Sequence, residues 1–139
     1  MKTIKITLPE GFKLGKFNES TGEVEIVPIK GKVEDRVKDY ITACKELGIK
    51  LKKNPHPCTI IKTVAEALNN GVKIDFSNED QNKYYPHFEL NNNSIVFGGC
   101  RYITYCYCLG QVAFTTTSEK AELLAKICKK EYEAILNDY

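Results

Sequence analysis

The spacing of the apolar residues changes at Lys83, and this change constrains the fold more than any other feature of the chain. Between residues 32 and 70 the apolar side chains recur every three or four positions, which is the period of an α-helix. From Lys83 to residue 115 they alternate with polar side chains, as in half-buried β-strands. Residues 117–136 return to the helical spacing. Helices and an antiparallel sheet in separate stretches of chain predict an α+β fold.

Two helices are predicted before the sheet. The first covers residues 32–47 with one continuous apolar stripe and ends at Gly48, which supplies a left-handed stop. The second covers residues 57–70 and ends at Gly71. Residues 75–82 follow as a polar loop whose side chains bond to their own backbone.

The sheet is predicted to be a four-stranded antiparallel meander with the helices on one face. Short turns join its strands, and Gly98-Gly99 is one of these turns. The last helix covers residues 117–136 and begins with a capping box formed by Thr116 and Glu119. The strands are expected at residues 83–90, 94–98, 101–108 and 111–115.

An N-terminal β-hairpin arm is predicted in front of this core. Its strands are expected at residues 2–8 and 23–29, with a turn from Asn18 to Gly22. A two-stranded hairpin is only marginally stable in water, so the arm must lie on something. The chain of 139 residues is expected to be a single domain, with residues 1–30 as the arm and residues 31–139 as the α+β core.

Composition excludes several classes of protein. A net charge of +2 gives no strong attraction to nucleic acid or membranes. No apolar run approaches the roughly 20 residues of a membrane span, and the alternating N-terminus lacks the apolar stretch of a signal peptide. We therefore expect a cytoplasmic protein with reduced thiols. Ten side chains are expected to be buried: Val37, Ile41, Cys44, Ile61, Val64, Leu68, Phe88, Phe97, Leu124 and Ile135.

Metal binding and catalysis have weak support in the sequence. His56-x-Cys58 and Cys106-x-Cys108 have one-residue gaps, whereas zinc sites commonly use wider pairs. Cys44 and Cys128 lie on helix stripes and read as core residues. His56 and His87 are the two histidines, and no nucleophile elbow, phosphate loop or dinucleotide fingerprint occurs. We predict no catalytic residue, no metal and no cofactor.

Aromatic residues of the predicted sheet suggest an alternative function. Rings on an open sheet face can stack on single-stranded nucleic acid while basic side chains contact the phosphates. The expected phosphate ligands are Arg101, Lys83 and the segment Lys50, Lys52 and Lys53. Alternation separates Tyr102 from the other rings of its strand, so which of them face outward stays open. The possible binding surface comprises Tyr85, Arg101, Tyr102, Tyr105 and Tyr107.

Several segments resemble a family of small uncharacterised proteins encoded by gut Bacteroidales genomes, prophages and phages. The resemblance lies in the Asp35–Gly48 helix, the Ala67–Gly71 helix end and, most specifically, the Gln81–Phe88 stretch. This chain has no tryptophan, and Val72, Phe76 and His87 stand where the family tends to have one. The resemblance implies a phage or mobile-element origin and carries no catalytic residue.

These observations together predict a non-enzymatic binding or structural protein that acts through protein–protein contacts. A host or phage protein is the expected partner, and an exposed strand of the hairpin arm could pair with its sheet. Nucleic acid is the alternative partner, and no membrane is expected. The resemblance makes a virion-associated location the alternative to the cytoplasm, and the sequence leaves the oligomeric state open.

Overall fold

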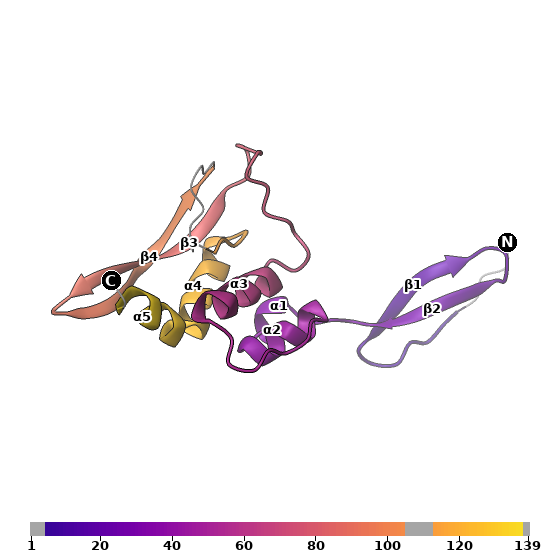
Figure 1. Ribbon diagram of the computed structural model, residues 1–139. Coiled ribbons are helices and arrows are strands. Elements are labelled where there is room, and N and C mark those ends of the chain that lie inside the picture. Colours follow the sequence, from indigo (N-terminus) through magenta and orange to yellow (C-terminus); the bar gives the residue numbers. More distant parts are fainter. Residues whose placement is uncertain (1–4, 105–112, 138–139) are drawn as a thin grey trace. The chain divides into compact units, whose positions relative to one another are not determined.

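The computed structural model describes residues 5–104 and 113–137. Over these residues the chain forms five helices and two separate two-stranded antiparallel sheets, which is a mixed α+β fold (Figure 1). It divides into two compact units, Met1–Gly31 and Lys32–Tyr139. The single four-stranded meander predicted from the sequence is not formed by the described residues.

The first unit is an antiparallel hairpin of β1 (Phe12–Asn18) and β2 (Glu23–Pro28). Its second strand and its turn agree with the prediction, but the first strand begins later than expected, and residues 5–8 form no strand. The turn is tight because the Asn18 side-chain oxygen accepts a hydrogen bond from the Ser20 amide at 3.0 Å. Because the turn is tight, β2 pairs with the residues directly before it, Phe12–Asn18, rather than with residues 5–8.

The second unit begins with two helices where the sequence predicted one. They are α1 (Val33–Arg36) and α2 (Tyr40–Leu47), with Val37 in an extended conformation between them. Asp39 caps α2, because its carboxylate accepts from the Thr42 amide at 2.8 Å and Thr42 Oγ1 accepts from the Asp39 amide at 3.0 Å. Gly48 ends α2 in the left-handed conformation, as predicted.

The helix α3 (Pro57–Leu68) and the loop after it follow the prediction closely. His56 caps α3, since its Nδ1 accepts from the Cys58 amide at 3.2 Å. In the loop, the Asp75 carboxylate accepts hydrogen bonds from both the amide and the hydroxyl of Ser77. The polar loop is therefore held by its own side chains.

The second sheet pairs β3 (Lys83–Asn91) with β4 (Ser94–Ile103). The predicted turn at Gly98-Gly99 is wrong, because both glycines lie within the strand β4. The register shifts there, so that Gly98 is an extra residue in a β-bulge. Gly99 has a φ of +123°, which other residues rarely adopt, and a Cβ on Gly98 would lie 2.8 Å from Glu89 Cγ.

The remaining predicted strands are described only in part. Residues 105–108 of the predicted third strand lie outside the described residues. Residues 111 and 112 of the predicted last strand also lie outside the described residues. Within residues 113–115 there is one bridge, in which Thr115 exchanges two backbone hydrogen bonds with Tyr84 on the side of β3 away from β4.

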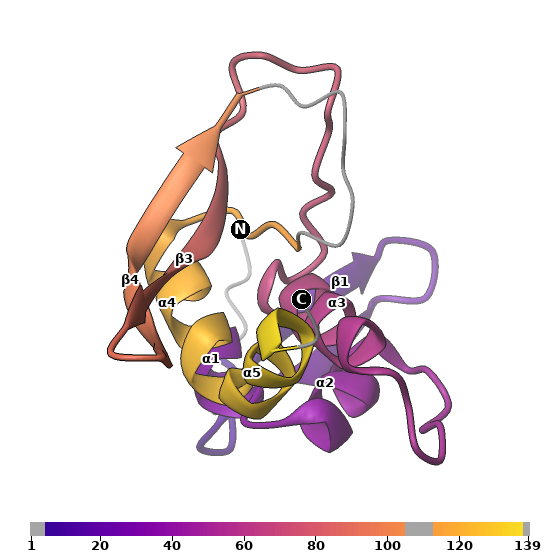
Figure 2. The ribbon, with the colours of Figure 1, turned by 60° about the vertical axis from the view of Figure 1, so that its left-hand side comes forward.

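The last predicted helix is divided into α4 (Ser118–Ile127) and α5 (Lys129–Asn137). Thr117 rather than Thr116 caps α4, because Thr117 Oγ1 accepts from the Lys120 amide at 3.2 Å. Thr116 is held outside the helix, since its amide donates to the side-chain oxygen of Asn69 at 3.0 Å. In Figure 2, α4 lies against both strands of the second sheet.

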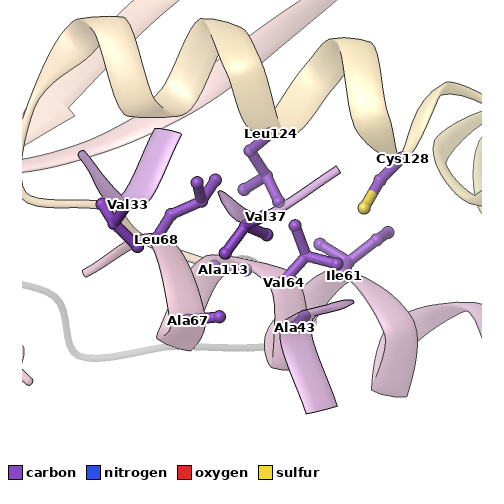
Figure 3. Packing of buried hydrophobic residues seen from close by; sticks show 11 residues of the cluster. Val33, Val37, Ala43, Ile61, Val64, Ala67, Leu68, Ala113, Leu124 and Cys128 are labelled. Carbon is purple, nitrogen blue, oxygen red and sulfur yellow. The ribbon is translucent and has the colours of Figure 1, made fainter. Parts of the chain in front are cut away.

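The hydrophobic core of the second unit lies between α3 and α4 (Figure 3). Leu124 points from α4 toward Val37 and Val64. Two residues that were expected to be buried are exposed. Ile41 is 51% exposed, because the break before α2 changes the direction in which the residues of that helix point. Phe97 is 41% exposed and lies near the turn of the second hairpin. Of the other expected residues, six are buried and two are partly buried: Val37, Cys44, Ile61, Val64, Leu68 and Leu124, and Phe88 and Ile135.

Candidate functional site

A β-bulge in β1 gathers apolar side chains on one face of the N-terminal hairpin. The register pairs Leu14 with Ile26 and Phe17 with Val24. The two residues between Leu14 and Phe17 therefore face a single residue of β2. Without this extra residue, alternation would place Phe17 on the opposite face from Leu14. The bulge thus creates a continuous apolar face.

We refer to this surface as the hairpin face, and the described residues of its own unit leave its large side chains exposed. Its large side chains are exposed at 40% for Phe12, 49% for Leu14, 62% for Phe17 and 49% for Ile26. No charged residue belongs to it. The hairpin face comprises Phe12, Leu14, Phe17, Val24, Ile26 and Pro28.

The opposite face of the hairpin carries charge. Lys13 pairs with Val27, and alternation places Glu23 and Glu25 on the same side. Gly15 also faces this side, where a Cβ would lie 3.0 Å from Val27 Cγ1. The hairpin therefore has one apolar face and one charged face. The apolar face favours contact with another apolar surface, whereas the charged face favours water.

The sequence prediction missed this face because it placed the first strand at residues 2–8. A usable signal was present, since Phe12 and Leu14 alternate with polar residues directly before the predicted turn. Phe17 breaks that alternation, so a pattern search alone does not place it with Leu14. The missing information is the bulge, which only the strand pairing defines.

The aromatic residues predicted to bind nucleic acid do not form one platform within the described part of the chain. Tyr85 is half-buried, with its ring 5.8 Å from the buried ring of Phe114. Tyr102 is 60% exposed, and its ring lies 5.8 Å from that of Tyr84. Arg101 is exposed and pairs with Tyr85, so alternation separates it from Tyr102. Tyr105 and Tyr107 lie outside the described residues.

Lys83 was expected to contact phosphate, and the structure shows that this expectation is wrong. The residue is completely buried. Its ammonium group donates to the backbone carbonyl oxygens of Asn78 at 2.8 Å, Gln81 at 2.8 Å and Thr104 at 2.6 Å. An ammonium has three protons, so these bonds use its full donor capacity. Lys83 therefore joins the polar loop to the end of β4.

An apolar groove of about 530 Å³ lies beside α3 in the second unit. The Asn69 side chain in this lining is already engaged, since its amide donates to the Phe114 carbonyl and accepts from the Thr116 amide, both at 3.0 Å. The lining also includes the charged residues Lys62, Glu66 and Lys73, but most of it is apolar, which favours an apolar group. The lining residues are Leu47, Lys62, Ala65, Glu66, Asn69, Gly71, Val72, Lys73, Ile74, Phe76, Ala113 and Phe114.

The cysteines predicted to be core residues, Cys44 and Cys128, are buried. Burial raises the pKa of the Cys128 thiol to about 12, so this group stays protonated at neutral pH. Cys58 contributes its amide to the His56 cap, and Cys106 and Cys108 lie outside the described residues. Among the residues that the structure describes, no three histidine, cysteine or acidic side chains gather as metal ligands would.

Comparisons with known proteins add no family to this geometry. No family model matches the chain, and no curated protein or solved structure is significantly similar to it. No helix in the described ranges is long and apolar enough to span a membrane.

Proposed function

We propose that this protein is a non-enzymatic binding or structural protein that acts through protein–protein contacts made by its N-terminal hairpin. The observation that supports the proposal is the hairpin face, with Phe17 exposed at 62% beside three other large apolar side chains. The resemblance of the chain to phage and mobile-element proteins supports a partner from the phage or its host.

The energetics of a hairpin support the same proposal. Two strands alone bury too little apolar surface for independent stability, and a packed second layer supplies what is missing. Each square ångström of apolar surface removed from water contributes about 25 cal/mol. A partner that covers the hairpin face would therefore stabilise the hairpin and gain affinity from the same contacts.

Replacing Phe17 by aspartate is expected to abolish partner binding, because it places a charge at the most exposed point of the hairpin face. The measurement is affinity capture of the tagged full chain from cells that carry the encoding phage or mobile element. The matched control is Val27→Asp, which makes a similar change on the opposite face. Equal recovery of the partner by Phe17→Asp and the parent chain would contradict the proposal.

Single-stranded nucleic acid is a second candidate partner, favoured by the exposed Tyr102, whose ring lies 5.8 Å from that of Tyr84. If it binds there, Tyr102→Ala should cost about 1–3 kcal/mol of binding free energy, as lost stacking does. Arg101 lies on the opposite face of β4, so Arg101→Ala should leave the slope of log affinity against log salt unchanged, whereas one lost phosphate contact would lower it by about 0.7. Fluorescence anisotropy with a labelled oligonucleotide measures both. The control is Lys126→Ala on α4, and equal effects of all three changes would contradict this site.

A further inference from the structure

We infer that the partner of the hairpin face is a second copy of this chain, so that two hairpins stack face to face in a symmetric dimer. This inference rests on the proposed function and names its partner. Two features of the hairpin support it: the distribution of charge over its strands and faces, and the area of its apolar face.

Charge disfavours the other way in which two hairpins could join symmetrically. The strand β1 carries only positive side chains, Lys13 and Lys16, and β2 carries only negative ones, Glu23 and Glu25. Symmetric edge-to-edge pairing places each strand beside its own copy, so like charges would meet at either edge. The hairpin face has no charge, and stacking through it avoids this repulsion.

Stacking also keeps the charged side chains out of the interface. A two-fold axis parallel to the strands places β1 of one copy over β2 of the other, and the lysines and glutamates of both copies then point outward into water. The two sheets would pack about 10 Å apart, as in a β-sandwich. Each copy would supply the second layer that the other hairpin lacks.

The available area points to a weak dimer rather than a permanent one. Four large side chains at about half exposure leave roughly 100 Å² each, given about 150–250 Å² for a large aromatic side chain. Two copies would bury about 1,000 Å² once Val24, Pro28 and the adjoining backbone are included, which is near the lower limit for a specific interface. Association should therefore depend on protein concentration.

Sedimentation velocity of the full chain over a wide concentration range tests the inference. We expect a reversible monomer–dimer equilibrium, with the dissociation constant raised at least about 30-fold by Phe17→Asp, as for the loss of a central aromatic contact. Val27→Asp on the charged face should change it by less than about threefold. Amide NMR signals of Gly15 and Gly22 show in each variant whether the hairpin is still formed.

Each other outcome has a separate meaning. A chain that stays monomeric at all concentrations overturns the inference, and capture of a different protein that depends on Phe17 would then leave the proposed function standing. A dimer that persists in Phe17→Asp overturns the inference, because its interface lies elsewhere. If the hairpin stays folded in both variants and Phe17→Asp and Val27→Asp raise the dissociation constant of the dimer equally, the inference is also overturned. The two faces would then contribute equally to association.

Discussion

Replacing Lys83 by methionine is expected to lower the free energy of unfolding by about 3–5 kcal/mol, although the side chain keeps its length. The ammonium of Lys83 is completely buried and donates to three backbone carbonyl oxygens. Each hydrogen bond to a charged group contributes about 1.5–3 kcal/mol, but methionine also removes the desolvation cost of burying an ammonium, so the net loss is smaller than the sum of three bonds. Urea denaturation followed by far-UV circular dichroism measures the loss.

Lys126→Met is the matched control for this prediction. The Lys126 side chain is 70% exposed and forms an ion pair with Glu122 at 3.1 Å, one helical turn away. Such a surface pair contributes about 0.3–0.5 kcal/mol. A loss below about 1 kcal/mol for Lys83→Met would mean that water replaces the ammonium at the three carbonyls. The loop would then be held by its other hydrogen bonds.

Leu124→Ala is expected to destabilise the second unit by about 2–5 kcal/mol, as other leucine truncations in protein cores do. The side chain is fully buried in the cluster between α3 and α4 (Figure 3). Its removal leaves a cavity, because its neighbours Val37 and Val64 are packed within the same buried cluster and cannot move freely into the space. The same denaturation experiment measures this change.

The control for Leu124 is Leu136→Ala in α5, where the side chain is 39% exposed. This change should cost clearly less, because a partly exposed leucine loses less transfer free energy and leaves no closed cavity. If both variants lose the same small amount, below about 1 kcal/mol, then α4 does not belong to the main core.

Local features were predictable where the deciding atoms lie close together in sequence. The turn from Asn18 to Gly22 and the polar loop at residues 75–82 depend on side chains that reach the backbone a few positions away. The stop at Gly48 depends on the left-handed conformation that a glycine adopts without strain. The break before α2 is also local, since Asp39 and Thr42 form its capping box. The continuous apolar stripe over residues 32–47 concealed that signal.

The sequence by itself thus determined the helical segments, the turn of the first hairpin and the mixed α+β class, because these follow from hydrophobic period and from short-range hydrogen bonds. Tertiary structure decided the rest. The Asn69 side chain accepts a hydrogen bond from the Thr116 amide, 47 positions away, and so keeps Thr116 out of α4. The Thr104 carbonyl accepts a hydrogen bond from the buried ammonium of Lys83, 21 positions away. Strand pairing decided which side Phe17 faces, because one bulged residue reverses the alternation of every side chain that follows it.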